Sequence, residues 1–392
     1  MTSAATSAGQ KSRASARSRQ LDIFRGIAAV LMVTNHAGYH LLAPTQSDAG
    51  WPGALVFAGS AAPALFFFAT GVGSGMAPDR PEAFQGVIRK VLLLLLADSF
   101  MNWGYGVLLG LDFFGFAAIS MATLFLVRRT SRPALVAAGL LALVCVARFG
   151  LVSVLHGAAE DNAAVAFVTG IGGSPHISYP LCPWLAFPLA GFLIGRSAAG
   201  VSPLREQLAG LAIALAGFGG AIEMARHGAV VHRWGTVSLA YFLFAIAFVT
   251  ALWLVASWLE RARSAAVDGL LLRGPASLLI VPLHYGALGL IAATLGTGWP
   301  PGAWLAGTVL LCVAVLVTAR AMVALLGSTV TTRSAGAQCL ALALAAAATL
   351  AAFQWAPKLL LLEVACLAEI VVAAVLFLSS RASRPAGLVP AT

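Results

Sequence analysis

The chain has 392 residues, of which 60% are hydrophobic and only 10% are charged. Soluble domains are typically about 45–50% apolar and about 25% charged, so this composition excludes an ordinary water-soluble enzyme. At about 20 residues per crossing, the length predicts an all-α polytopic membrane protein, a bundle of about 10–12 transmembrane helices. The formal net charge of +10 does not indicate a nucleic-acid binder, because the basic residues follow a membrane pattern.

The first 20 residues are polar and carry basic side chains without an acidic one, so we expect residues 1–20 to form a disordered basic tail. Most lysine and arginine residues fall in this tail and in every second connection, the bias that marks cytoplasmic loops. Both termini are therefore predicted to be cytoplasmic, in a multi-pass protein of a bacterial cytoplasmic membrane. Twelve apolar segments follow the tail, near 22–45, 54–76, 91–110, 112–127, 134–154, 179–195, 207–225, 237–258, 275–296, 302–322, 335–356 and 359–379.

The five cysteines stand singly within apolar segments, with no ligand-like spacing to one another or to histidine. This pattern predicts neither a zinc site nor a disulfide framework, and no metal is expected. Gly71, Gly73 and Gly75 of the second segment indicate close helix packing rather than a nucleotide-binding loop.

The first apolar segment carries a dense set of polar residues: Asp22, Arg25, Asn35, His36 and His40. An ionisable group at membrane depth costs a few kcal/mol, so each is a functional candidate. His36 follows Arg25 by eleven positions, which leaves the two side chains about 20° apart on one helix face. Asp22 and His40 fall near the same stripe, whereas Asn35 lies one residue step around the helix.

The axial distance from Arg25 to His36 is about 16 Å on a helix. With the N-terminus in the cytoplasm, Arg25 would lie at the cytoplasmic mouth and His36 deep in the membrane. This spacing suits acyl-CoA, whose phosphates would pair with the guanidinium of Arg25. His36 would then act as general base on an acceptor hydroxyl or amine. The competing interpretation is a structural Asp22–Arg25 ion pair and a histidine that hydrogen-bonds a neighbouring helix.

His284 is the next candidate, about ten residues into the ninth segment and near the depth of His36. It could orient that imidazole, contact the acyl carbonyl or bond a neighbouring backbone. Asp98 lies about eight residues into the third segment, where pairing inside the bundle is the alternative to a site role.

Prolines at 180, 183 and 188 must break the sixth segment. Broken helices at membrane depth lie beside protein or a cavity, so Trp184 is expected to line a cavity there, unless it belongs to an interfacial belt. Arg233, in the loop before the eighth segment, goes against the positive-inside bias and indicates a ligand. The same loop offers Thr236 or Ser238 as a helix N-cap.

Four patches of the sequence resemble the transmembrane acyltransferase superfamily, which includes the membrane acyltransferase-3 proteins and the heparan-α-glucosaminide N-acetyltransferase-like proteins. LDIFRGIA at 21–28, followed by Asn35 and His36, is similar to the first helix of that family, in which an arginine precedes a histidine by this interval. The others, in family order, are GSAAPALFFFATG at 59–71, the proline-tryptophan stretch YPLCPWL at 179–185, and SLLIVPLHY at 277–285.

The resemblance implies an acyltransferase-like transmembrane core over residues 21–296. Additional transmembrane helices over 297–380 and a cytoplasmic tail over 381–392 complete the expected organisation. Some heparan-type members carry asparagine at the position of His36 and a histidine in the following loop, where this chain has His40 and Asp48. Which histidine is the base is therefore open.

We expect a membrane acyltransferase that moves an acyl group, above all acetyl, from cytoplasmic acyl-CoA to a hydroxyl or amine of a sugar, glycan or glycolipid. We expect His36, His284 and Asn35 to be catalytic, Arg25, Asp22 and Trp184 to hold acyl-CoA, and His40, Asp48, Arg233 and Asp98 to contact the acceptor. The expected partners are membrane lipid, acyl-CoA, the acceptor and a second copy in a homodimer, and no nucleic acid. The alternative is a secondary transporter or exporter of a small polar or lipid-linked solute, because twelve spans, buried charges and a broken helix also describe that class.

Overall fold

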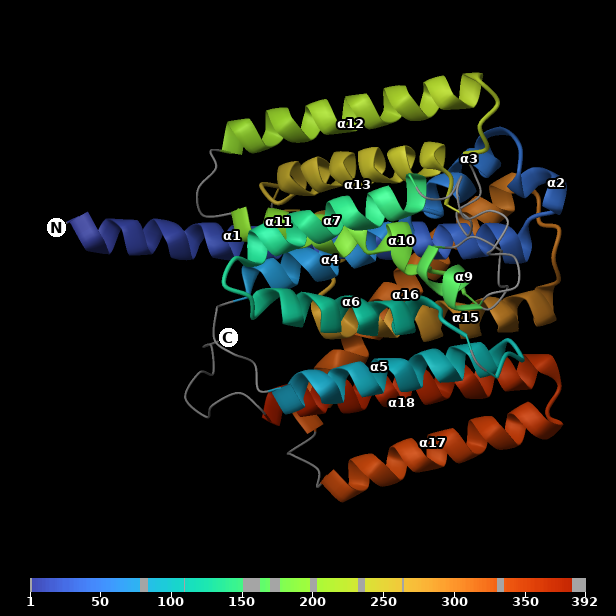
Figure 1. Ribbon diagram of the computed structural model, residues 1–392. Helices are drawn as coiled ribbons and strands as arrows, with labels where there is room; N and C mark the ends of the chain where they lie inside the picture. Colours follow the sequence, from blue (N-terminus) through green and yellow to red (C-terminus); the bar gives the residue numbers. More distant parts are fainter. Residues whose placement is uncertain are drawn as a thin grey trace.

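The computed structural model describes residues 2–77, 84–108, 110–150, 163–169, 177–197, 203–231, 237–262, 264–329 and 335–382. Within these ranges the regular structure is α-helical, apart from two isolated bridges, Leu42 with Trp299 and Leu111 with Ile177. The predicted all-α class is therefore confirmed for the described part of the chain. The helices, shown in Figure 1, are α1 (Thr2–Leu41), α2 (Pro44–Ser47), α3 (Gly50–Gly59), α4 (Ala62–Met76), α5 (Phe84–Gly104), α6 (Phe113–Arg128), α7 (Pro133–Phe149), α9 (Ala163–Thr169), α10 (Leu181–Trp184), α11 (Ala186–Ser197), α12 (Pro203–Arg226), α13 (Leu239–Leu259), α14 (Ala265–Leu270), α15 (Gly274–Leu295), α16 (Pro301–Thr329), α17 (Ala335–Trp355) and α18 (Lys358–Ala382).

The helices form a polytopic membrane bundle. Among the described residues, 7 helical segments are long and apolar enough to cross a bilayer, and one of these joins α3 and α4. Shorter apolar helices lie at Phe113–Arg128, Pro133–Phe149 and Leu181–Ser197. Together with α1 and α5, these elements account for every apolar segment of the sequence.

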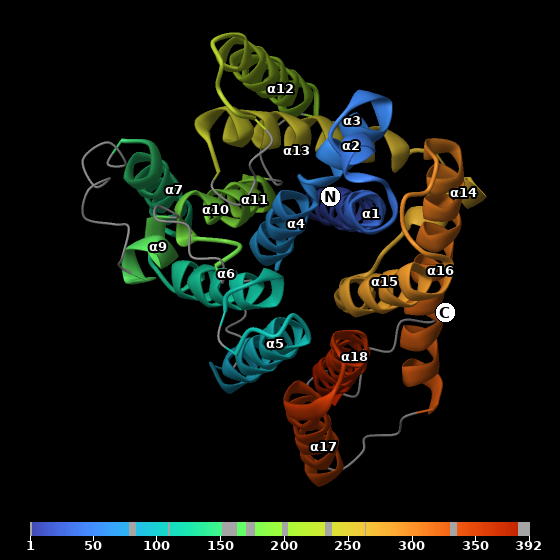
Figure 2. The same ribbon diagram turned by 90° about the vertical axis from the view of Figure 1, so that its right-hand side faces the viewer.

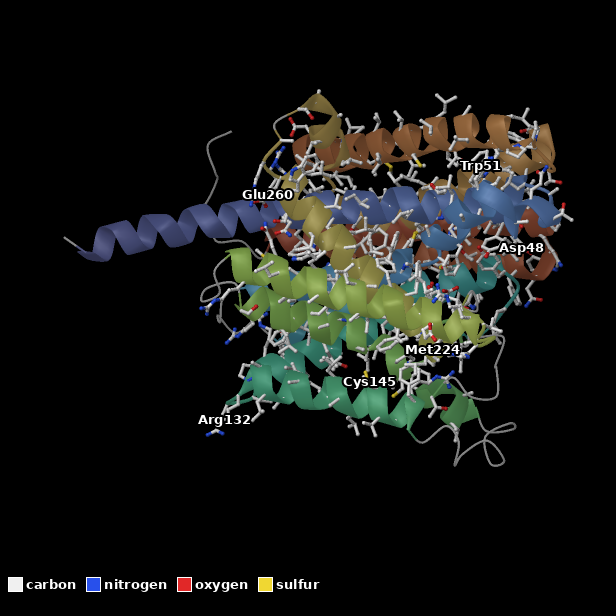
Figure 3. The ribbon with its side chains drawn as sticks, turned by 90° about the horizontal axis from the view of Figure 1, so that it is seen from above. Asp48, Trp51, Arg132, Cys145, Met224 and Glu260 are labelled. Atoms are coloured by element: carbon white, nitrogen blue, oxygen red, sulfur yellow. The ribbon has the colours of Figure 1, made fainter. Side chains whose placement is uncertain are left out.

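Successive spans run in opposite directions, so α1 begins and α18 ends at the same end of the bundle (Figure 1). We call this the inner end and the opposite one the outer end. Figure 3 shows Arg132 and Glu260 at the inner end and Asp48 at the outer end. At the outer end Arg148 of α7 donates to the carbonyls of Thr169 in α9 (3.0 Å) and Val237 (3.1 Å).

Helix α1 lies in the middle of the bundle, in contact with α3, α4, α13, α15 and α16 (Figure 2). Its burial explains why the polar residues of the first segment face other helices rather than lipid. At its inner part Gly26 meets the chain after α14 so closely that a Cβ there would overlap the carbonyl of Leu270. The backbone amide of Leu272 donates to the carbonyl of Asp22 at 3.0 Å.

The start of α1 differs from the expectation for residues 1–20. The helix begins at Thr2 and runs without interruption to Leu41, so the segment expected to be disordered is helical. Alanine-rich sequence without proline permits this extension, because alanine has the highest helix propensity and an existing helix needs no new nucleus.

The peripheral helices present apolar side chains outward. Only 11% of the α17 span is buried, against 78% of the α3–α4 span. Leucines such as Leu215 on α12 and Leu310 on α16 are more than half exposed, as expected for surfaces that meet lipid. The division of the chain at residue 297 stays a prediction, although α16 packs directly on α1 and α18 packs on α5 and α15.

Glycines bring α4 and α11 into close contact. A Cβ at Gly71 would overlap the carbonyl of Pro188, and one at Gly191 would overlap that of Phe68. Gly75 and Gly195 face each other in the same seam. The interpretation of Gly71 and Gly75 as a close packing surface is confirmed, whereas Gly73 faces Arg25 of α1. The seam fixes α4, whose Pro63 lines the cavity described below.

Two of the spans are broken. The sixth one divides into α10 and α11 at Leu185, as its prolines predict. The second one divides into α3 and α4 at Ser60 and Ala61. Side chains from other helices bond carbonyls at this break: Asn35 Nδ2 donates to Val56 O at 2.7 Å, and the Tyr241 hydroxyl donates to Ser60 O at 2.8 Å. Irregular backbone at this depth requires such partners, and it lies here beside a cavity.

Candidate functional site

The imidazoles of His36 and His284 meet inside the bundle. His36 comes from α1 and His284 from α15, and their atoms Nδ1 and Nε2 lie 2.6 Å apart. The second nitrogen of His284, Nδ1, lies 2.6 Å from the backbone carbonyl of Ile280. His284 is 0% exposed.

Tyr285 completes the contacts of His36. Its hydroxyl lies 3.0 Å from His36 Nε2, so both ring nitrogens of His36 are hydrogen-bonded to residues of α15. The Tyr105 ring, from the connection after α5, packs edge-on against Tyr285 with centroids 5.8 Å apart. The histidine is therefore held in one orientation by a neighbouring helix.

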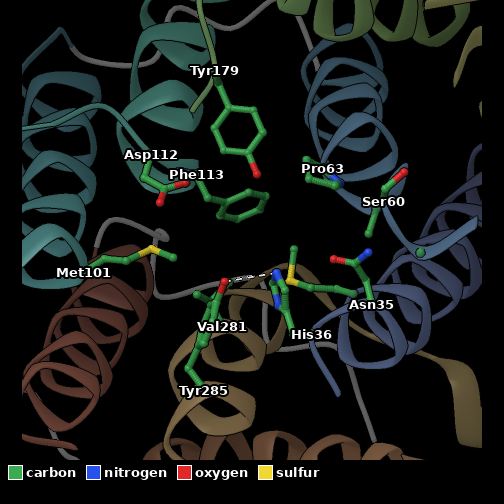
Figure 4. A pocket seen from close by; sticks show the side chains of 13 residues that line it. Asn35, His36, Ser60, Pro63, Met101, Asp112, Phe113, Tyr179, Val281 and Tyr285 are labelled. Carbon is green, nitrogen blue, oxygen red and sulfur yellow. Dashed lines mark hydrogen bonds between the residues drawn. The ribbon is translucent and has the colours of Figure 1, made fainter. Parts of the chain in front are cut away.

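His36 and Tyr285 line a small cavity with a volume of about 70 Å³, shown in Figure 4. Such a volume has room for a few water-sized groups. Asn35, Ser60 and Pro63 form one wall, next to the α3–α4 break. Asn35 therefore lines the same cavity as His36, although the two side chains leave α1 in different directions.

The opposite wall carries residues for which the sequence predicted no role in the site. Asp112, Phe113 and Tyr179 face the cavity from the side away from His36 (Figure 4). Asp112 is the N-cap of α6 and accepts from the amide of Phe113 at 2.8 Å. An acidic residue directly before an apolar helix is a capping signal, and only the fold shows that this cap also faces a cavity.

Asp98 does not line this cavity. It is 3% exposed on α5, and its Oδ2 accepts from the amide of Asp112 at 3.1 Å and from Asn102 Nδ2 at 3.2 Å. A Cβ at Gly115 would lie 2.5 Å from that oxygen, so Asp98 is packed against the N-terminus of α6. A carboxylate there satisfies amides that lack a helical partner and complements the helix dipole.

Arg25 lies near the inner end of the bundle, away from the cavity of His36. Its Nη1 pairs with Asp22 Oδ1 at 3.1 Å, and both side chains are largely buried. Its guanidinium lies between α4 and the start of α15, within 4.0 Å of the positions where Cβ atoms would stand at Gly73 and Gly274. Arg25 lines neither the cavity of His36 nor the outer cavity described next.

A second, larger cavity opens at the outer end, with a volume of about 390 Å³. Tyr39, Asp48 and Phe57 contribute to its lining. Ser60 lines both cavities, so the α3–α4 break separates the outer cavity from that of His36. Asp48 is exposed, as a residue at a cavity mouth would be.

The remaining predicted residues are placed as follows. Trp184 is 0% exposed and stands behind Tyr179, with ring centroids 5.0 Å apart, so Tyr179 rather than Trp184 lines the cavity. His40 lies one turn beyond His36, its ring 6.3 Å from that of Tyr285, and it lines neither the cavity of His36 nor the outer cavity. Arg233 lies outside the described residues, while Ser238 is the N-cap of α13. Among the described residues, no group of His, Cys, Asp or Glu side chains gathers as a metal site.

A polytopic helical bundle with a buried, hydrogen-bonded imidazole facing a cavity defines a membrane protein with an intramembrane site. The family described as heparan-alpha-glucosaminide N-acetyltransferase, catalytic, matches residues 17–221, which is just over half of the chain. The chain therefore belongs to this family of membrane N-acetyltransferases. No curated protein and no solved structure was found to match it. His36 and Asp112 lie within the matched residues, whereas His284 and Tyr285 lie beyond them.

Proposed function

We propose that the protein transfers an acetyl group from cytoplasmic acetyl-CoA to a hydroxyl or amine of a glycan or glycolipid, with His36 as the general base. The observation that carries the proposal is the position of His36: its Nε2 faces a cavity inside the bundle, on the helix that also carries Arg25. Both termini would then lie in the cytoplasm, because the basic connections lie at the inner end.

Arg25 is the proposed contact for the phosphates of the donor. Its guanidinium lies beside the first turn of α15, where backbone amides lack helical partners and the helix dipole favours an anion. Asp22 holds it in place through the 3.1 Å ion pair. The axial distance of about 16 Å to His36 suits the slender arm that joins the phosphates of acetyl-CoA to its thioester.

The proposed reaction is a direct transfer between two bound substrates. His36 Nε2 takes the proton of the acceptor O–H or N–H while the acceptor oxygen or nitrogen attacks the thioester carbonyl carbon. The carbon–sulfur bond then breaks, and the imidazolium returns the proton to the leaving thiolate. Labelling of His36 by acetyl-CoA without an acceptor would instead indicate an acyl-histidine intermediate.

The acceptor is proposed to enter from the outer end. The outer cavity carries a carboxylate and a phenol, Asp48 and Tyr39, which are groups that bind sugar hydroxyls, and it meets the cavity of His36 at Ser60. In the cavity of His36, Asp112 lies on the wall opposite the imidazole and is the proposed contact for the acceptor's nucleophilic group. The α3–α4 break would have to open for a sugar to pass, because the cavity of His36 is small.

The test is acetyl-CoA thioester cleavage by the purified protein in lipid nanodiscs, with glucosamine and a glucosaminyl lipid as acceptor probes. We expect acceptor-dependent release of CoA, and a decrease of about 10²–10⁴-fold in kcat for His36→Gln. His227→Gln is the matched control, because His227 is exposed at the end of α12. No cleavage with any acyl donor, together with solute flux in liposomes, would overturn the proposal in favour of a transporter.

A further inference from the structure

The two nitrogens of His36 have different hydrogen-bond partners, and these partners decide which nitrogen carries the proton. Both partners come from α15, which lies outside the residues matched by the family. A neutral imidazole has one N–H donor and one lone-pair acceptor. Placing the proton on one nitrogen of a ring therefore fixes the role of the other nitrogen and of the group bonded to it.

The assignment starts at the backbone. The carbonyl of Ile280 can only accept, so His284 Nδ1, at 2.6 Å, must carry a hydrogen. A neutral His284 then has a lone pair on Nε2. That atom lies 2.6 Å from His36 Nδ1, which must therefore donate. The remaining nitrogen of His36, Nε2, is left with the lone pair, and it accepts from the Tyr285 hydroxyl at 3.0 Å.

The surroundings favour the neutral forms that this assignment assumes. His284 is fully buried, between Leu283 and Tyr285 on a helix of apolar residues. None of the ion pairs formed by the described residues places a carboxylate against either imidazole. A buried charge without a counter-ion is costly, so the pair is neutral at rest.

We propose that His284 is a positioning residue that fixes His36 as the Nδ1–H tautomer and thereby makes Nε2, the nitrogen facing the cavity, the basic atom. Tyr285 donates to that lone pair in the resting protein and gives way to the acceptor's hydroxyl or amine. The catalytic consequence rests on the proposed function, whereas the tautomer itself is a property of the resting protein.

The tautomer is tested by NMR of ¹⁵N-histidine-labelled protein in lipid, with His36→Gln used to assign the His36 signals. We expect a protonated Nδ1 and an unprotonated Nε2 on His36 in the wild type and in Tyr285→Phe, and a mixture of tautomers in His284→Ala. A wild-type Nε2–H, or a tautomer kept in His284→Ala and lost in Tyr285→Phe, would overturn the proposal. This readout needs no turnover, so it is independent of whether the proposed function holds.

The catalytic consequence is tested by a chemical rescue. We expect His284→Ala to lower kcat by about 10- to 100-fold, less than loss of the base itself, with little change in KM. His284→Gln should retain more activity, because its amide oxygen can accept from His36 Nδ1–H. Replacing His36 by Nδ1-methylhistidine in the His284→Ala background leaves Nε2 as the sole basic nitrogen, and the methyl group occupies the vacated space.

We expect this double variant to recover most of the lost activity, whereas the same analogue opposite an intact His284 should be poorly active because of steric overlap. Failure of the rescue in a protein that folds as the wild type would mean that His284 acts through packing alone. Absence of any turnover in the wild type would instead contradict the proposed function and leave the NMR result to decide the tautomer.

Discussion

Arg25 and His36 share one face of α1, but the helix carries them into different surroundings. His36 is clamped by His284 and Tyr285 beside a cavity, whereas Arg25 is paired with Asp22 near the inner end. Helix periodicity alone predicted the common face, because it depends only on the backbone repeat. The side chains that contact this face from other helices depend on tertiary packing, so the sequence alone could not predict them.

Arg25→Gln should raise the KM for acetyl-CoA by about 10- to 100-fold with a smaller effect on kcat, because a hydrogen bond to a charged group contributes about 1.5–3 kcal/mol. The KM of Arg25→Lys should lie between those of the wild type and Arg25→Gln, because lysine keeps the positive charge but loses the planar guanidinium group. Steady-state kinetics at varied acetyl-CoA concentration provide the measurement. Arg132→Gln, an exposed arginine at the same end, is the control, and an unchanged KM in Arg25→Gln would remove Arg25 from the donor site.

Asp112 and Tyr285 line the site although the sequence predicted no site role for either. Asp112 looks like an ordinary helix cap, and Tyr285 looks like an apolar neighbour of His284. Each becomes part of the site only because α6 and α15 approach α1 from opposite sides of one cavity. Trp184 shows the reverse case, since its prominence in the sequence reflects an aromatic core behind the cavity wall.

At the scale of elements, the breaks and seams of helices position the site. The prolines of the sixth segment predicted its break, because proline removes a backbone donor. The break between α3 and α4 has weaker local signals, and Asn35 and Tyr241 hydrogen-bond carbonyls beside it from other helices. Contacts between residues so far apart in the chain cannot be predicted from the local sequence pattern.

The seam between α4 and α11 is a second property at this scale. Gly191→Leu should lower the thermal unfolding temperature in detergent and the yield of monodisperse protein, because overpacking typically costs about 1–3 kcal/mol and here meets the backbone of Phe68. Gly219→Leu is the matched control, since no atom lies within 4 Å of a Cβ at that position on α12. Equal unfolding temperatures for the two variants would contradict the packing interpretation.

At the scale of the whole molecule, charge bias and helix direction give one orientation. Ser131→Cys lies in the α6–α7 connection at the inner end, and Thr297→Cys lies in the α15–α16 connection at the outer end; both positions are exposed. In a Cys339→Ser background, a membrane-impermeant maleimide should label Thr297→Cys in intact cells and Ser131→Cys only after permeabilisation. The opposite pattern would place acetyl-CoA on the wrong side for Arg25 and contradict the proposed function.

The sequence by itself determined that the protein is an all-helical membrane bundle, where its segments lie, and that Arg25 and His36 share one face of the first helix. Those properties follow from composition, hydropathy and the helix repeat, which are local and survive any arrangement of neighbours. Only the tertiary structure decided that His284 and Tyr285 hold His36, that Asp112 faces it, and that Asp98 and Trp184 serve the packing around it. Contacts between helices depend on three-dimensional packing between residues as far apart as α1 and α15, and no periodicity within one segment encodes them.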